Sequence, residues 1–170
     1  NFDSRDYILS PQQWRAIPGA LHAIATLTRR RIPVAVASNQ SAVGRGMITH
    51  EQFAAIRATM EQQIAAAGGA LATQAYCFHT PDDSCDCRKP KPGLIRQILT
   101  TLHSNPDETI MIGDSLRDIE AALAAGVAAA LVISGHHESE SLIDQVEQLD
   151  SAIPIFPDLA TAITTLLPSA

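Results

Sequence analysis

Short apolar runs alternate with segments of helical pattern along this chain, and this alternation constrains the fold more than any other feature. Apolar runs at 32–37, 109–112 and 128–133 are typical of buried parallel strands, and residues 72–78 have the pattern of a further strand. Segments with apolar residues at helical spacing lie between these runs. Because helices that connect parallel strands cover both faces of the sheet, the alternation predicts a doubly wound α/β domain with a mostly parallel sheet.

Local signals set the ends of the predicted helices. A helix that begins at Pro18 ends in the basic run 29–31, which suits a helix C-terminus. Thr49 and Gln52 have the spacing of a capping box, which would open a helix that runs to about Ala67. The remaining predicted helices cover 92–102, 115–125 (with Gly126 as its stop) and about 158–167.

Length and charge narrow the class of protein. The chain has 170 residues, 46% of them hydrophobic, which suits a single globular domain over 1–170. Its formal net charge of −6 offers no general attraction to nucleic acid or anionic lipid. The weakly polar stretch 121–133 is too short to span a bilayer, and no basic leader precedes an apolar core. We therefore expect a cytoplasmic, monomeric protein without nucleic-acid or membrane partners, whose cysteines stay reduced.

All three cysteines lie close to one histidine, in the pattern Cys77-x-His79-x5-Cys85-x-Cys87. Three thiolates and one imidazole complete a tetrahedral zinc site and leave no position for water, so a site of this kind is structural. The alternative is three small buried hydrophobic residues beside a loop histidine. The polar composition of residues 80–84 and the lack of any other cysteine favour zinc over that alternative.

Polar clusters lie beyond three of the predicted strands. They are Ser38 to Ser41, Arg88 with Lys89, and Gly113 to Ser115. Folds of this class bind ligands at the carboxyl ends of their strands. Hydroxyls, amides and fixed positive charge suit a phosphoryl group, and a carboxylate suits Mg²⁺. Each cluster alone could be a turn, a solvated loop or a helix cap, so the prediction of a phosphate and magnesium site depends on all three together.

Three segments resemble motifs of the haloacid dehalogenase superfamily of phosphatases. They are SNQ at 38–40, RKPKPG at 88–93 and IGDSLRDIEAA at 112–122. The cysteine and histidine insertion narrows the likeness to the zinc-containing members that act on D-glycero-D-manno-heptose 1,7-bisphosphate or on histidinol phosphate. The stretches SNQSAVGRGMIT at 38–49 and DYILSPQQWRAIPGAL at 6–21 are more similar to the heptose enzymes. The resemblance implies a phosphatase that removes the 7-phosphate of the heptose bisphosphate, in the synthesis of ADP-heptose and the lipopolysaccharide core.

The resemblance also implies a role for each matching residue. Ser38 and Lys89 would hold the transferring phosphoryl group, and Asp114 would bind magnesium with Asp118 as a supporting carboxylate. Zinc would tether the loop that carries Arg88 and Lys89. The residues implied in substrate binding are Asp3, Tyr7, Asn39, Gln40, Ser41, Arg88 and Ser115, and the implied zinc ligands are Cys77, His79, Cys85 and Cys87.

The first motif of the superfamily, Asp-x-Asp at the end of the first strand, has no counterpart in these 170 residues. That motif supplies the nucleophilic aspartate and the acid/base aspartate. The resemblance therefore predicts a sheet without its first strand and essentially no turnover by the chain as printed. Two alternatives stay open: the same chemistry on histidinol phosphate, and a zinc-stabilised domain that binds phosphate without turning it over.

Overall fold

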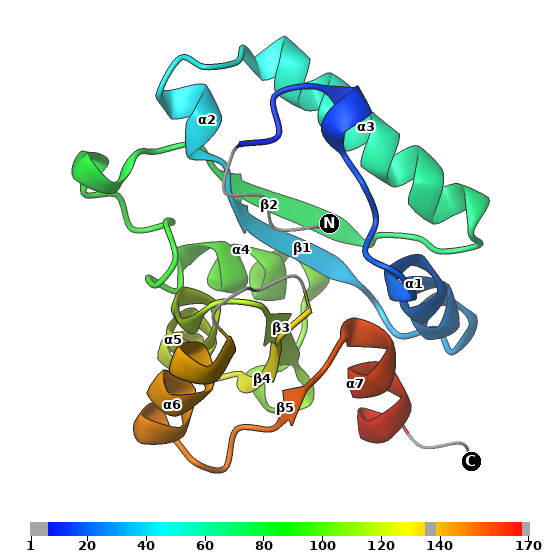
Figure 1. Ribbon diagram of the computed structural model, residues 1–170, viewed down its shortest axis with the longest axis vertical. Helices are drawn as coiled ribbons and strands as arrows, with labels where there is room; N and C mark the ends of the chain where they lie inside the picture. Colours follow the sequence, from blue (N-terminus) through cyan, green and yellow to red (C-terminus); the bar gives the residue numbers. More distant parts are fainter. Residues whose placement is uncertain (1–6, 135–138, 168–170) are drawn as a thin grey trace.

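The computed structural model describes residues 7–134 and 139–167, so the predicted substrate residue Asp3 lies outside the described residues. Strands and helices alternate along the chain, as the sequence predicts (Figure 1). The strands are β1 (Ala35–Asn39), β2 (Thr73–Cys77), β3 (Ile110–Gly113), β4 (Ala128–Val132) and β5 (Ile155–Phe156). The helices are α1 (Ala20–Arg29), α2 (Ser41–Gly44), α3 (His50–Ala66), α4 (Gly93–Leu102), α5 (Leu116–Ala125), α6 (Ser139–Leu149) and α7 (Leu159–Leu166), with 3-10 turns at Pro11–Gln13, Pro81–Asp83 and Pro106–Glu108.

The described strands are all parallel and form two sheets. One sheet has the order β1-β2, in which Asn39 lies opposite Cys77, and the other has the order β3-β4-β5. The α/β class and the parallel direction of the strands are thus confirmed. The single sheet expected from the sequence is divided, in the part of the chain that the structure describes, between β1 and β3.

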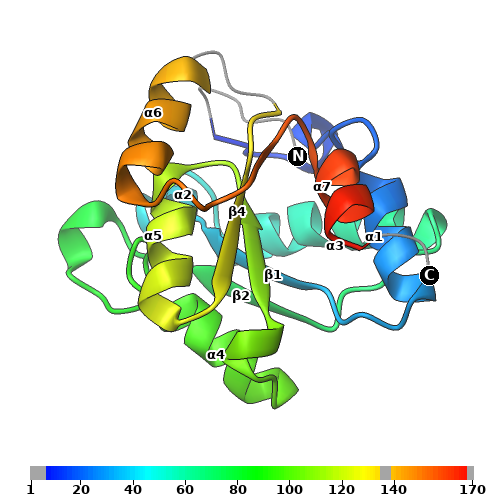
Figure 2. The ribbon, with the colours of Figure 1, turned by 90° about the horizontal axis from the view of Figure 1, so that it is seen from below.

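Helices cover both sheets (Figure 2). Helix α4 packs against β1 and β2 and also against α5. It therefore joins the half of the molecule that contains β1 and β2 to the half that contains β3, β4 and β5. Helix α5 packs on β3 and β4, while α7 packs on β4, β5 and α1. The largest buried cluster lies in the second half, around Ile119 and Leu131, which are both fully buried.

The helix ends follow the signals in the sequence. Thr49 and Gln52 form the predicted capping box, with the Gln52 N–H donating to Thr49 Oγ1 over 3.1 Å and the Thr49 N–H to Gln52 Oε1 over 2.8 Å. Asp158 caps α7 by accepting from the Thr161 N–H, and α5 ends at Gly126. No helix among the described residues is long and apolar enough to cross a membrane.

The predicted first strand is displaced along the chain. The expected range was 32–37, but β1 covers Ala35–Asn39, so Ser38 and Asn39 are its last two residues and do not follow it. The physical reason is pairing with β2, since Ser38 lies opposite Tyr76 and Asn39 opposite Cys77. A strand ends where its residues no longer pair with residues of the neighbouring strand. This end cannot be predicted from an apolar run in the sequence alone.

Candidate functional site

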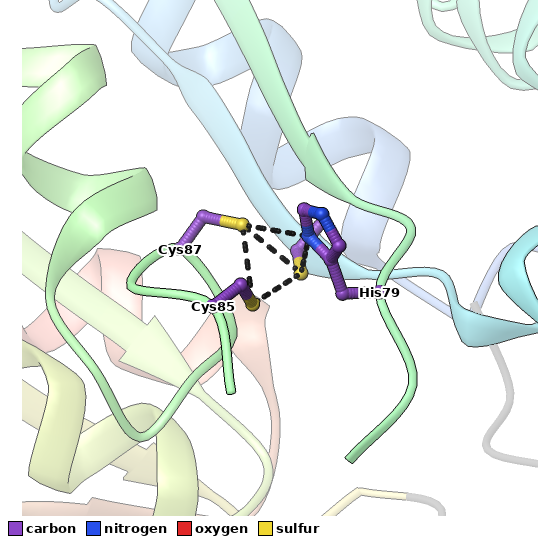
Figure 3. A group of neighbouring side chains, drawn as sticks. His79, Cys85 and Cys87 are labelled. Atoms are coloured by element: carbon purple, nitrogen blue, oxygen red, sulfur yellow. Dashed lines mark hydrogen bonds between the residues drawn. The ribbon is translucent and has the colours of Figure 1, made fainter. Parts of the chain in front are cut away.

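Four side chains meet where β2 ends and the following loop folds back on itself (Figure 3). Cys77 is the last residue of β2, and His79, Cys85 and Cys87 belong to the loop. The ligand atoms of all four residues lie within 4.8 Å of one another. The Sγ atoms are 3.2 to 3.7 Å apart, and His79 Nδ1 lies 3.3 Å from Cys87 Sγ. The four predicted ligands are therefore brought together.

These separations fit one tetrahedral zinc ion, whose Zn–S bonds of about 2.3 Å place the ligand atoms roughly 3.8 Å apart. Burial raises the pKa of Cys87 to about 12, and the thiols of Cys77 and Cys85 add to the rise. Thiols this close resist joint ionisation, and a divalent cation between them would remove the repulsion. Because the protein supplies all four ligands, a metal here has a structural role.

The loop also contains hydrogen bonds of its own. Asp83 Oδ2 accepts from the Thr80 N–H over 2.6 Å and from the Thr80 hydroxyl over 2.9 Å. The backbone hydrogen bond, followed by the hydroxyl, lowers the pKa of Asp83. Beyond the ligands, Arg88 donates to the His79 carbonyl oxygen over 3.1 Å. Hydrogen bonds therefore stabilise the loop both within it and at its end, where Arg88 and Lys89 follow in fixed positions.

Two hydrogen bonds join the backbone of Lys89 to the side-chain amide of Asn39 at the end of β1. Asn39 Nδ2 donates to the Lys89 carbonyl oxygen over 3.0 Å, and the Lys89 N–H donates to Asn39 Oδ1 over 3.1 Å. An amide can both donate and accept, so one asparagine satisfies both groups of the Lys89 backbone. The predicted clusters at 38–41 and 88–89 therefore meet.

The Lys89 side chain is buried, with 9% of its surface exposed. Its Nζ donates to the Ala37 carbonyl oxygen over 2.7 Å and forms an ion pair of 2.5 Å with Asp118 Oδ1. Burial alone would raise the pKa of Asp118, but the Lys89 charge and hydrogen bonds from Lys89, from the Ser115 hydroxyl and from the Asp114 N–H outweigh it and lower the pKa. Asp118 is therefore ionised at neutral pH.

The third predicted cluster begins at the end of β3. Gly113 is needed there because an added Cβ would overlap Asp118, which packs directly against it. Ser115 is the N-cap residue of α5, but its hydroxyl makes no capping bond and donates to Asp118 Oδ2 over 2.7 Å. Asp114 lies between them, half-buried, at the carboxyl end of the strand.

Magnesium fits this end of β3 only in part. Asp114 offers a carboxylate where the strand ends, which is the type of oxygen ligand that Mg²⁺ prefers. Asp118, expected to support Asp114, is instead the ion-pair partner of Lys89. Within 7–134 and 139–167, the cysteine and histidine cluster is the one group of three or more His, Cys, Asp or Glu residues close enough to share an ion. The described residues therefore supply Asp114 as one magnesium ligand but do not supply a complete set of ligands.

The remaining predicted residues lie around the end of β1. The Gln40 amide donates to Ser38 Oγ over 2.9 Å, and Ser41, which is buried, lies 3.4 Å from the Tyr7 hydroxyl oxygen. The sequence analysis did not predict the ion pair of Asp118 with Lys89. The only signal in the sequence was the position of Asp118 shortly after Asp114, and that spacing does not identify Lys89 as the partner.

Comparison with known proteins agrees with this arrangement. Residues 86–162 match the HAD-hydrolase-like family (Hydrolase_like). The D-glycero-beta-D-manno-heptose-1,7-bisphosphate 7-phosphatase of Pseudomonas putida is 38% identical over 98% of this chain and 93% of its own length. The enzyme of the same name from Pseudomonas aeruginosa is 39% identical over 98% of this chain and 92% of its own length.

A solved structure is similar over the whole chain. It is the D,D-heptose 1,7-bisphosphate phosphatase of Bordetella bronchiseptica in complex with magnesium and phosphate, at 38% identity and a TM-score of 0.93. The match covers 100% of this chain and 93% of that one. From the shared fold, the metal-binding loop and identity at this level over nearly all of both sequences, we conclude that this chain belongs to the D-glycero-beta-D-manno-heptose-1,7-bisphosphate 7-phosphatase family of HAD-like hydrolases.

Proposed function

We propose that this chain binds the 7-phosphate of D-glycero-D-manno-heptose 1,7-bisphosphate at the carboxyl end of β1 and takes part in its hydrolysis. The observation that carries the proposal is the position of Lys89. Its ammonium group is buried at the strand end, and its backbone is fixed by Asn39. The substrate is that of the relatives from Pseudomonas and Bordetella, as their names give it.

In this proposal the polar groups at the end of β1 hold the phosphoryl charge. An ammonium group has three N–H donors, and Ala37 and Asp118 engage two of them, which leaves the third for a phosphoryl oxygen. The Ser38 hydroxyl would donate a second bond to the same group. Fixed donors in a buried site stabilise developing charge without having to reorganise during the reaction.

The two metals have different tasks in this proposal. Zinc, held by Cys77, His79, Cys85 and Cys87, would keep the loop folded so that Arg88 and Lys89 stay in place. Magnesium would neutralise phosphoryl charge, with Asp114 as one of its ligands.

A second candidate function follows from the lack of an Asp-x-Asp pair in these 170 residues. The three thiols belong to the metal cluster, so none of them is free to accept the phosphoryl group in place of that nucleophile. The chain as printed would then bind phosphate without hydrolysing it. Histidinol phosphate, the other substrate considered, has no support from the relatives described above.

Phosphate release from heptose 1,7-bisphosphate and from histidinol phosphate tests the proposal. We would compare the printed chain with a version preceded by an apolar strand that ends in Asp-x-Asp, each with and without Lys89→Met. We expect release by the longer version alone, with the heptose substrate preferred and the activity abolished by Lys89→Met. A preference for histidinol phosphate would refute the substrate, and activity that survives Lys89→Met would refute the role of Lys89.

A further inference from the structure

The three thiols of the metal cluster lie close together and differ in how far solvent reaches them. Cys77 is 1% exposed, whereas Cys85 and Cys87 are half-buried. His79 and residues 81–84, which belong to the same loop, are exposed. A small oxidant can therefore reach the two sulfurs of the loop, and a buried third sulfur lies beside them. A partly exposed thiolate with a resolving thiol as neighbour is typical of cysteines that are oxidised reversibly.

The distances between the sulfur atoms favour one pair for this reaction. Cys87 Sγ lies 3.2 Å from Cys77 Sγ and 3.5 Å from Cys85 Sγ, and the sulfurs of Cys77 and Cys85 are 3.7 Å apart. Cys85 and Cys87 are separated by one residue, so a bond between them would close a small ring that restricts the torsion of the disulfide. The favoured product is therefore the disulfide of Cys77 with Cys87.

The backbones of this pair are fixed by their neighbours. Cys77 ends β2 opposite Asn39, and its carbonyl oxygen accepts from the Gln40 N–H over 2.7 Å. Cys87 packs against the first residue of α4, since a Cβ added to Gly93 would lie 2.8 Å from Cys87 Cα. The sulfurs need to approach by only about 1 Å to reach disulfide distance, which is a movement of side chains.

Hydrogen bonds distinguish the two sulfurs that solvent reaches. The backbone N–H groups of Arg88 and Cys87 both donate to Cys85 Sγ. Such bonds stabilise a thiolate and reduce its nucleophilicity. The neighbours of Cys87 Sγ are the other two sulfurs and His79 Nδ1, at 3.2 to 3.5 Å. Cys87 is therefore the more reactive of the two towards an oxidant.

We propose that Cys87 and Cys77 form a site of reversible oxidation, where a peroxide converts two metal ligands into a disulfide and the metal is released. Cysteines that hold a metal do so as thiolates. In the first step the Cys87 thiolate attacks one oxygen of hydrogen peroxide, the O–O bond breaks, and Cys87 sulfenic acid and hydroxide form. In the second step the Cys77 thiolate attacks the Cys87 sulfur, the S–S bond forms, and a second hydroxide leaves. The two sulfurs lose two electrons, and two protons from solvent convert both hydroxides into water.

Oxidation at this pair loosens one part of the loop and retains another. Only two of the four ligands remain, which is too few for a structural zinc site. Residues 78–86 lose the metal that holds them together, and they include the carbonyl group to which Arg88 donates over 3.1 Å. Cys87 stays joined to the end of β2, and Lys89 follows it two positions later. Amide hydrogen exchange in the oxidised chain should therefore accelerate over 78–86 and remain slow in β2.

Peroxide titration of the zinc-loaded 170-residue chain tests this inference. An indicator dye measures zinc release, and peptide mass spectrometry after alkylation of free thiols identifies the bonds that form. We expect one zinc ion released for each disulfide, a bond between Cys77 and Cys87, and Cys85 recovered as an alkylated thiol. Dithiothreitol with added zinc should restore the metal content. Met47, which is 45% exposed, is the internal control for indiscriminate oxidation and should remain unmodified at the same peroxide concentration.

Two variants test the assigned roles. Cys85→Ser keeps the reacting pair and should form the same disulfide. Cys77→Ser lacks the resolving thiol and should accumulate sulfinic acid at Cys87. The bonds identified in the wild type do not depend on the folding of either variant. A disulfide that includes Cys85, a disulfide formed without zinc release, or zinc retained at a peroxide concentration that already oxidises Met47 would overturn the inference.

Discussion

The two halves of the molecule differ in what holds them together. In β4, which lies between β3 and β5, four of the five residues are buried. In β1 none of the five residues is buried, although the first three are apolar. β1 pairs with β2 on one side, and on its other side a groove of about 480 Å³ is lined by Ala35 and Ala37 and, across it, by Ile110 and Met111 of β3.

The difference shows how a part of the sheet with a small apolar cluster is stabilised. The cluster of the second half contains ten buried residues, and burial on that scale can stabilise a sheet by itself. The cluster beneath β1 and β2 has three, Ala75, Cys77 and Leu94, with Cys85 and Cys87 packed against it. Three of the proposed zinc ligands therefore also belong to this core. The first half also has a cluster of five buried residues, Trp14, Ala42, Ile48, Phe53 and Ile56, which packs against Tyr76 and Phe78. We infer that the metal supplies at Ala75, Cys77 and Leu94 what apolar burial supplies in the second half.

The largest expected effect is loss of the metal. Cys85→Ser combined with Cys87→Ser should abolish stoichiometric zinc binding, which in structural sites is worth on the order of 10 kcal/mol of folding free energy. Amide hydrogen exchange should then accelerate across β1, β2 and residues 78–91, while β4 stays protected. Elemental analysis and hydrogen exchange measure both effects. Full zinc occupancy in the double variant, or equal loss of protection in β4, would refute the comparison.

A smaller effect is expected where the two halves meet, at the ion pair of Lys89 with Asp118. Asp118→Asn leaves a buried ammonium group without its counter-charge and should cost about 3–5 kcal/mol. Lys89→Met in the same chain should recover part of the loss, since it removes the uncompensated charge. Urea unfolding of both single variants and the double variant measures this coupling. If the losses in free energy of unfolding of the two single variants add up in the double variant, the ion pair does not couple the two halves.

The same pair predicts a pH dependence. The pKa of Asp118 is lowered in the folded protein, so its contribution to stability is complete above the unfolded value of about 4. That contribution is lost as the pH falls further through the lowered pKa. The wild type should therefore lose stability below about pH 4 more steeply than the Asp118→Asn variant does.

The smallest of these effects concerns the apolar half. Leu131 is fully buried in β4, and Leu131→Ala should lower the free energy of unfolding by about 2–5 kcal/mol through lost burial and a cavity. Zinc content should not change, because the metal loop belongs to the other half. Leu123→Ala, at a position that is 41% exposed, is the matched control and should have little effect. Loss of zinc from the Leu131→Ala variant would show that the halves do not act separately.

Features that depend on neighbouring residues could be predicted from the sequence. The capping box of Thr49 and Gln52 and the end of α5 at Gly126 are local, because the bonds involved join residues within one helical turn. The four metal ligands fall within eleven residues, from Cys77 to Cys87. Their number, type and short spacing therefore indicate a zinc site from the sequence alone. The alternation of strands and helices likewise indicated the α/β class.

What only the tertiary structure decided involves residues that are far apart in the chain. The end of β1 at Asn39 depends on pairing with β2, and Asn39 holds Lys89 from 50 positions away. The partner of Lys89 is Asp118, on α5, which the resemblance implied as a supporting carboxylate for Asp114. The sequence determined which groups this protein has for binding metal and phosphate, because those are properties of side chains and of short spacings. Which of these groups face one another was set by the packing of strands and helices, since distant residues meet only when burial of the apolar faces fixes the whole arrangement.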